Sequence, residues 1–286
     1  MAAELAAELE TRDVAQSAPR WSRAPQIRLW SGLWPQLVAL ALAVAVWQVV
    51  VWSGWRQANV LPGPLPVFQS LFNDLSRGDF YVGVAITLQR AVLGYGIAVV
   101  AGSAVGLLVA RVSILRRALG SALLGLQSMP SISWFPLAIL LFQRSEPAII
   151  FVVLLGAAPA IANGLLSGVD HVQPLLVRVG RVMGARGLGL YRHVILPAAL
   201  PSFVGGLKQG WAFAWRSLMA GELIIAFAGH QPSLGQQLRL AQNLSDTQQL
   251  IALMIVIFTI GVVVDLGFGV LDREIRQRWG LLGAES

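Results

Sequence analysis

Hydrophobic residues are gathered into long runs, and short polar stretches that contain Arg separate these runs. Crossing the hydrocarbon core of a bilayer takes about 20 residues of helix. Six runs are long enough, and they cover residues 36–55, 88–110, 119–142, 146–168, 200–228 and 248–271. Pro130, Pro136 and Pro159 fall inside the third and fourth runs, where neighbouring helices can satisfy the freed backbone groups, so kinks are predicted there. The pattern predicts an all-α polytopic membrane protein with about six transmembrane helices.

A shorter amphipathic element is predicted between the first two runs. Apolar residues recur there at i, i+1, i+4, i+5 and i+8, and these are Val67, Phe68, Leu71, Phe72 and Leu75. The stripe leaves Asp74 on the polar side and predicts an interfacial helix that begins near Pro66 and stops at Gly78. Packing along the bundle is the expected role, and ligand delivery is the alternative.

Composition supports a membrane protein over a soluble one. Hydrophobic residues make up 56% of the chain and charged residues 12%, with a mean hydropathy of +0.68. Acidic residues dominate the first 13 positions, which is the wrong sign for a secretory leader. We therefore expect a cytosolic tail at 1–32, a transmembrane domain at 33–280 and a short C-terminal tail at 281–286. The chain has no Cys, which excludes disulfides and thiolate sites.

Arg residues are distributed unevenly among the connecting stretches. One set of alternating stretches holds Arg12, Arg20, Arg23, Arg28, Arg111, Arg116, Arg117, Arg178, Arg181, Arg186, Arg192, Arg273, Arg276 and Arg278. The other set holds Arg56, Arg77, Arg144 and Arg239. The positive-inside rule then predicts that both termini and residues 178–201 are cytoplasmic, in a plasma or inner membrane. Because the charge is dispersed, it indicates contact with anionic lipid and no nucleic-acid partner.

One of these stretches, RVGRVMGARGLGLYRHVILPAALP, runs from Arg178 to Pro201 between two apolar runs. Its four Arg residues and His193 cannot cheaply enter hydrocarbon, so the segment is expected to lie in water. Its apolar residues nevertheless recur at helical spacing. A helical element at the membrane surface that contacts a partner is predicted.

Residues typical of catalysis or metal binding are scattered. The three His residues lie in different contexts, and no clustered carboxylates accompany them, so no metal site is expected. The one Lys, Lys208, follows no Gly-rich phosphate loop, so this chain lacks a Walker A element. We expect a protein that is not an enzyme by itself, and any use of ATP would need another polypeptide.

Ionisable residues inside the apolar runs are the default functional candidates, namely Arg90, Lys208, Arg216, Glu222 and Asp265. Arg216 and Glu222 are six residues apart, so they cannot pair along their own helix. Arg216 is expected either to pair with Asp265 or to present its guanidinium to a passing anion. For Glu222 a structural hydrogen-bonding role is favoured.

The stretch from Arg178 to Pro201 resembles the cytoplasmic loop of binding-protein-dependent ABC importer permeases. The family motif is Glu-Ala-Ala, three residues, Gly, nine residues, Ile, one residue, Leu-Pro. Gly184 holds the motif Gly, Val194 the Ile position and Leu196-Pro197 the Leu-Pro, whereas Arg178-Val179-Gly180 replaces Glu-Ala-Ala. The resemblance extends over about residues 33–280 through the phrases LPGPLPV, TLQRAVLGYGIA, MPSISWFPLAIL, AWRSLMAGELI and SLG.

The resemblance implies a coupling helix between the fourth and fifth transmembrane helices, at about Ala185 to Tyr191, which docks on a cytoplasmic ABC ATPase subunit. The implied coupling residues are Gly184, Ala185, Arg186, Gly187, Leu188, Gly189, Leu190, Tyr191, Leu196 and Pro197. Gly184 would allow a sharp entry into that helix and Pro197 a rigid exit. It also implies a second permease copy, an extracytoplasmic binding protein and no cofactor on this chain, with ATP and Mg on the ATPase.

Within that superfamily the chain is most similar to the sulfonate, taurine and nitrate group, through MPSISWFPLAILLF and VLDREIRQRWG. An aliphatic sulfonate is the expected cargo, and nitrate, taurine, bicarbonate or a pyrimidine precursor are alternatives. As substrate-pathway candidates we take Arg216 and Glu222 with Ser131 and Trp134. A secondary transporter would show internal repeats and a membrane enzyme a convergent catalytic set, and the sequence shows neither.

Overall fold

The computed structural model describes residues 26–225 and 232–278, and these two ranges hold helices and turns but no strand. Residues 1–25 of the predicted N-terminal tail and the predicted tail 281–286 lie outside the described residues. The chain divides into two compact units between Arg56 and Gln57. The first unit contains α2 (Gln26–Trp52), which carries Pro35 inside the helix. The second unit contains all the remaining described helices and the candidate site residues.

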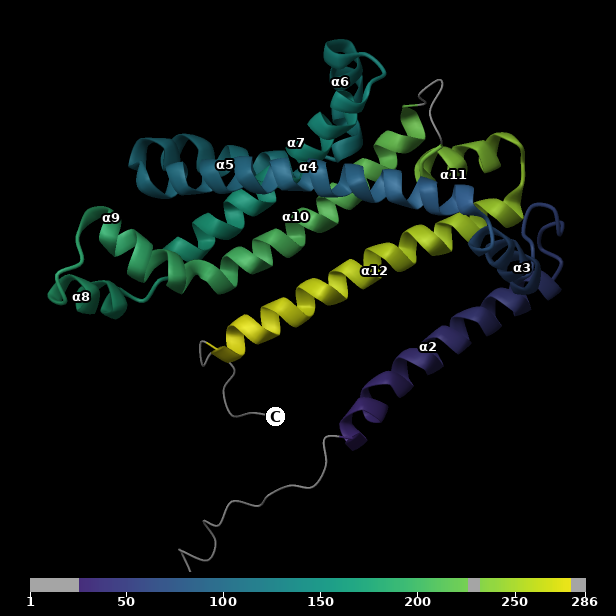
Figure 1. Cartoon of the computed structure of the whole chain (residues 1–286), viewed down its shortest axis with the longest axis horizontal. Helices are drawn as coiled ribbons and strands as arrows, with labels where there is room; N and C mark the ends of the chain where they lie inside the picture. Colours follow the sequence, from purple (N-terminus) through teal and green to yellow (C-terminus); the bar gives the residue numbers. More distant parts are fainter. Residues whose placement is uncertain (1–25, 226–231, 279–286) are drawn as a thin grey trace, which may run out of the picture. The chain divides into compact units, whose positions relative to one another are not determined.

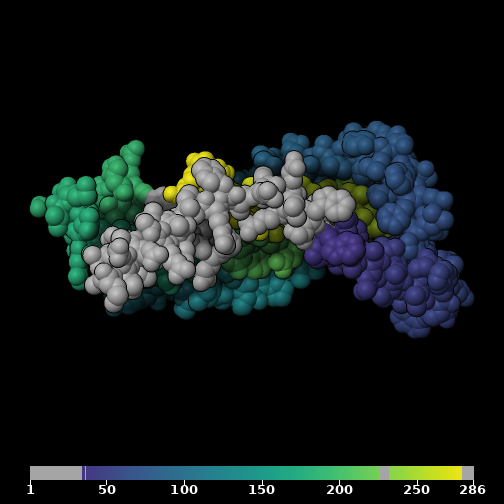
Figure 2. Space-filling view, turned by 90° about the horizontal axis from the view of Figure 1, so that it is seen from below, coloured from purple at the N-terminus to yellow at the C-terminus, as the bar shows by residue number. Residues whose placement is uncertain are grey.

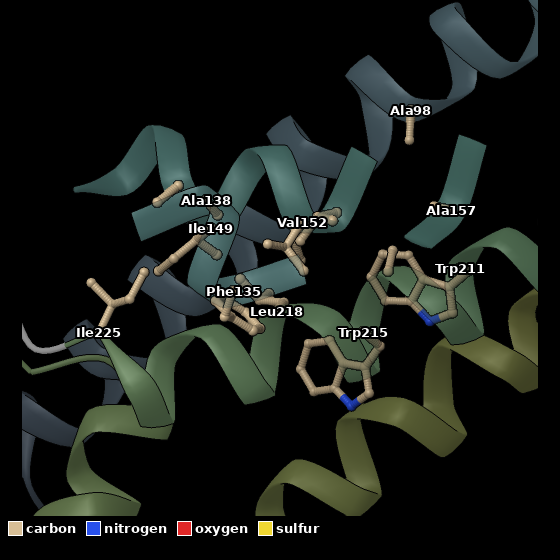
Figure 3. Close-up of a cluster of buried hydrophobic side chains, with 14 of the residues drawn as sticks. Ala98, Phe135, Ala138, Ile149, Val152, Ala157, Trp211, Trp215, Leu218 and Ile225 are labelled. Carbon is tan, nitrogen blue, oxygen red and sulfur yellow. The ribbon is translucent and has the colours of Figure 1, made fainter. Parts of the chain in front are cut away.

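The second unit is built around α7 (Glu146–Asp170), which packs extensively against both α4 (Gly78–Arg111) and α10 (Leu196–Ile224) (Figure 1). The buried core between these helices combines small and large apolar side chains, with Phe135 and Ala138 contributed by α6 (Phe135–Phe142) (Figure 3). This core fixes α10, which carries three of the intramembrane charges, against the rest of the unit.

α7 and α10 cross at a pair of glycines. A Cβ added to Gly206 would lie 2.7 Å from the Cα of Gly164, and one added to Gly164 would lie 2.4 Å from the Cα of Gly206. Only glycine allows the backbones to approach this closely, which is how small residues are used in membrane helix pairs. A Cβ added to the adjacent Gly205 would meet no atom within 4 Å, so this glycine faces away from the crossing.

Gly206→Ala is therefore expected to lower the free energy of unfolding by roughly 1–3 kcal/mol, because the added methyl forces the two helices apart. Gly205→Ala is the matched control, and a change within about 0.5 kcal/mol is expected there. Denaturant titration of both purified variants in the same detergent measures the difference. Equal stability of the two variants would show that the crossing is not tightly packed.

The third apolar run is not a kinked helix. It forms α5 (Ser113–Ser128), a short 3-10 turn η1 (Ser131–Trp134) and α6, with a bend of 103° between the two parts. The prediction of a kink at Pro130 is therefore wrong: Met129 adopts the extended conformation favoured before proline, and α5 ends there. Pro136 lies in the first turn of α6, where a missing N–H is tolerated, and Pro159 stays inside α7.

Length and composition qualify three described helices as membrane spans, namely α4, α7 and α12 (Thr247–Arg278), and the bent pair α5–α6 would make a fourth. α10 has 29 residues but contains Lys208, Arg216 and Glu222, and the apolar part of α2 covers Leu37–Trp52. The all-α fold class is confirmed, while the number of six spans stays a prediction.

The predicted amphipathic element is confirmed as α3 (Pro64–Leu75), although Gly78 already opens α4. The predicted burial of its apolar stripe is only partly confirmed. Val67 is buried, but Phe72 is exposed, and Asp74, which was expected on the polar side, is buried. The reason is a specific contact with α12, because Gln249 Nε2 donates to Asp74 Oδ2 at 2.7 Å. This hydrogen bond satisfies the Asp74 carboxylate at a buried position, which apolar spacing alone does not predict.

Candidate functional site

The segment that precedes α10 begins with α8 (Pro174–Val182), and Gly184 closes this helix. Gly184 has φ +90°, its N–H donates to the Arg181 carbonyl at 3.0 Å, and the Ala185 N–H donates to the Gly180 carbonyl at 2.9 Å. These two bonds with a left-handed residue after the helix form a Schellman motif. A glycine is needed at position 184 because a side chain at positive φ is strained.

The polypeptide then turns into α9 (Gly187–Leu190), where Gly187 also has positive φ, at +52°. This helix is shorter than the predicted one from Ala185 to Tyr191. Leu188 of α9 and Val182 and Met183 next to Gly184 are strongly exposed, at 72%, 89% and 82%. The α8–α9 segment projects at one end of the unit (Figures 1 and 2). Exposed apolar side chains on a projecting, Arg-rich segment are typical of a protein–protein contact.

A π-helical turn, η2 (Tyr191–Ile195), joins α9 directly to α10. Pro197 lies in the first turn of α10 and the helical path continues through it, so its role as a rigid exit stays a prediction. Proline lacks an N–H and crowds the carbonyl four residues earlier, and a wider π turn at that place relieves the conflict. The guanidinium of Arg111, the last residue of α4, lies 4.9 Å from the ring centroid of Tyr191.

A cavity of about 300 Å³ lies at the break between α5 and α6. Its lining includes Ser131, Trp134 and Arg216, three of the four pathway candidates. Arg216 Nε donates to the Ala212 carbonyl at 3.0 Å, and its guanidinium lies 5.1 Å from the Phe213 ring centroid. The structure thus brings a cation, a hydroxyl and an indole to one cavity, and Glu222 is not among the lining residues.

Asp265 does not pair with Arg216. Lys208 Nζ lies 3.1 Å from Asp265 Oδ2 instead. α10 and α12 run side by side with opposite directions, and a Cβ added to Gly261 would lie 3.2 Å from Trp215 Nε1. The part of α10 next to Arg216 therefore packs against Gly261, which lies about one helical turn before Asp265. Among the described residues, Arg216 has no carboxylate within ion-pair distance.

Glu222 is completely buried near the end of α10 and joins three helices. Its carboxylate accepts hydrogen bonds from Arg90 Nη1 at 3.1 Å, Thr87 Oγ1 at 3.0 Å and the Gly235 N–H at 3.0 Å. Arg90 also contacts Glu146 of α7 at 2.8 Å, and the Leu234 N–H donates to Thr87 Oγ1 at 3.0 Å. The carboxylate therefore ties α4 and α10 to the first turn of α11 (Leu234–Asn243).

Sequence reasoning singled out Arg90 and Glu222 but did not pair them, and it missed Thr87 altogether. An Arg inside an apolar run requires a partner, which was the available signal. Gly235 lies in the SLG phrase, where an added Cβ would meet the Glu222 Cβ at 2.4 Å. That glycine allows the α11 backbone to approach the carboxylate, but spacing along the sequence does not reveal such a contact.

The family model described as "Binding-protein-dependent transport system inner membrane component" matches residues 98–277, which is more than half of the chain. The chain belongs to this family. The match contains the projecting segment, the cavity at the α5–α6 break and all of α10. As a member, the chain is a membrane-embedded ABC importer permease subunit, and ATP hydrolysis belongs to a separate ATPase subunit with which it assembles.

Two curated permeases illustrate its relatives. The putative aliphatic sulfonates transport permease protein SsuC of Escherichia coli is 30% identical, and the alignment covers 82% of this permease and 88% of SsuC. The nitrate import permease protein NrtB of Synechocystis sp. is 28% identical, with 80% and 84% covered. These similarities place the permease in the sulfonate and nitrate branch and do not choose between the two substrates.

A solved structure shares the fold of this permease. Inward-facing conformations of the MetNI methionine ABC transporter align with a TM-score of 0.59 at 20% identity, over 69% of this permease and 96% of that chain. This likeness concerns the fold alone.

Proposed function

We propose that this permease forms the translocation path for a small anion, with aliphatic sulfonates as the first choice of cargo. The observation that carries the proposal is the position of Arg216 on α10. This residue borders the cavity at the α5–α6 break and has no carboxylate partner among the described residues. Nitrate is the main alternative, which the similarity to NrtB supports, and taurine, bicarbonate and a pyrimidine precursor are further alternatives.

The charges of α10 differ in how they are compensated. Lys208 is neutralised by Asp265 and Glu222 by Arg90, so both have a structural explanation. A cation placed in hydrocarbon costs several kcal/mol, so a guanidinium without a counter-ion in a membrane helix indicates a functional site. Its planar fork of N–H donors matches the oxygens of a sulfonate, and Ser131 and Trp134 add donors from the same cavity. A direct role of Glu222 in the pathway stays a prediction.

We also propose which partners complete the transporter, beginning with the ATPase that the projecting α8–α9 segment would contact. Gly184 to Tyr191, with Leu196 and Pro197 behind them, would form the ATPase contact, to which the exposed Val182 and Met183 add apolar surface. ATP and Mg would be bound by the ATPase, and this chain would carry no cofactor. A second copy of the permease would complete the path, and an extracytoplasmic binding protein would deliver the anion. Both termini are proposed to be cytoplasmic on the basis of the Arg distribution.

Arg216→Ala is expected to lower the maximal rate of alkanesulfonate uptake at least about tenfold, because the anion loses a charge-assisted contact. Arg216→Lys is expected to keep part of the rate, since it retains the charge without the planar fork. Initial uptake of a labelled alkanesulfonate is measured in cells that lack the native chain, at matched membrane levels of each variant. Normal uptake by Arg216→Ala at saturating ligand would exclude a required anion contact.

A further inference from the structure

A second, larger cavity of about 620 Å³ lies between α10 and α12, and Arg216 lines this cavity as well. Apart from Arg216 and Asp265, its lining on these two helices is apolar, and it includes Trp211, Trp215, Phe258 and Val262. Trp211 and Trp215 are stacked, with ring centroids 5.9 Å apart (Figure 3). Arg216 therefore lines both this apolar groove and the smaller cavity that contains Ser131.

The groove is shaped for an elongated apolar group. It follows α12 from Met254 to Leu266, which corresponds to about 18 Å of helix. Asp265, the one carboxylate in its lining, already pairs with Lys208. Its negative charge is therefore compensated and does not strongly repel an anion bound at Arg216. An occupant that matches both parts has an anionic head beside Arg216 and a hydrocarbon chain along α12.

We propose that the transported anion carries a hydrocarbon chain that lies in the α10–α12 groove, so that the permease itself selects for chain length. This inference rests on the proposed function and deepens it. Each methylene that leaves water for the groove contributes roughly a factor of four in affinity. Nitrate and bicarbonate have no such group, whereas a linear alkanesulfonate has both the head and the chain that the two cavities fit. Selection then does not reside only in the binding protein.

Neighbouring residues of α12 offer a matched pair of variants. Val262 lines the groove, whereas Val263 does not, and both side chains are exposed in the described structure. Val262→Phe narrows the groove, and Val263→Phe adds the same bulk on another face of the same helix. Neither residue belongs to the anion contact at Arg216. Both variants are expected to insert at the level of the wild type.

The experiment measures maximal uptake of labelled methanesulfonate, butanesulfonate and octanesulfonate by cells with the complete transporter. The same binding protein is present throughout, so its own preference cancels when rates are compared between variants. We expect Val262→Phe to lower octanesulfonate uptake at least about fivefold while methanesulfonate uptake stays within about twofold. Val263→Phe is expected to transport all three compounds like the wild type.

Each other outcome is informative in a different way. If Val262→Phe slows all three compounds equally or changes none, the groove does not hold the hydrocarbon chain of the substrate. Lipid or another polypeptide would then be its occupant, and the proposed import of an anion would be unaffected. If Val263→Phe shows the same loss as Val262→Phe, the effect is not specific to the groove and the inference fails. If the wild type transports nitrate but no alkanesulfonate, the proposed sulfonate function fails together with the inference.

Discussion

Glu222→Ala is expected to lower the free energy of unfolding by about 3–5 kcal/mol, the usual cost of removing one partner of a buried ion pair. The carboxylate is 0% exposed and accepts bonds from Arg90, Thr87 and the Gly235 N–H. Removing it leaves the Arg90 guanidinium without its buried counter-ion and the Gly235 N–H without its acceptor. Denaturant titration of the purified variant measures the loss.

Glu146→Ala is the matched control, because Glu146 contacts the same Arg90 but its side chain is 58% exposed. An exposed carboxylate in an ion pair contributes about 0–1 kcal/mol, so a small change is expected. Glu222→Gln, which keeps the shape and one acceptor oxygen, is expected to fall between the two. Equal losses for Glu146→Ala and Glu222→Ala would contradict the view that burial, and not charge alone, makes this contact important.

Periodicity located most helices well. The fourth apolar run was predicted at 146–168 and is observed as α7 at Glu146–Asp170, because a long apolar segment in a membrane has few other ways to satisfy its backbone than to form a helix. Gly184 was predicted to permit a sharp turn, and its φ of +90° shows the conformation that requires glycine. These features depend on local chemistry, which a single sequence contains.

Proline shows where local chemistry is not enough. Pro159 stays inside α7, which is buried between α4 and α10, whereas the run containing Pro130 breaks into α5 and α6. In α5 the buried side chain is Leu123, so little packing opposes a break there. The outcome for each proline is decided by the neighbouring helices, which the sequence pattern does not place.

The partners of the intramembrane charges were unpredictable for the same reason. Lys208, not Arg216, meets Asp265, since the pairing depends on how far α12 is shifted along α10. Thr87 and Gly235 were missed because their roles arise only when α4, α10 and α11 meet around Glu222. What could be predicted is that each charge within an apolar run needs compensation, and this expectation is what draws attention to Arg216.

Gly184→Asp is expected to leave the permease inserted in the membrane but to lower uptake at least about tenfold. Position 184 requires φ +90°, which costs an L-residue roughly 1–2 kcal/mol, and the Schellman bonds of Gly184 and Ala185 then no longer close α8 in the same geometry. The exposed Val182, Met183 and Leu188 lose their relative positions, so the ATPase contact is expected to weaken. Co-purification of the ATPase and ligand-stimulated hydrolysis measure this directly.

A matched pair of alanines separates backbone geometry from the added charge. A Cβ added to Gly184 or to Gly120 of α5 would meet no atom within 4 Å, but only Gly184 of these two has positive φ, and Gly120 lies outside the proposed ATPase contact. Gly184→Ala is therefore expected to reduce coupling in the same direction as Gly184→Asp, while Gly120→Ala retains it. If Gly184→Ala couples normally and Gly184→Asp does not, the charge disturbs the contact and the left-handed turn is dispensable. Retained coupling in Gly184→Asp would show that this segment does not form the ATPase interface. A docking contact that depends on the turn at Gly184 would not tolerate both a side chain at positive φ and an added negative charge.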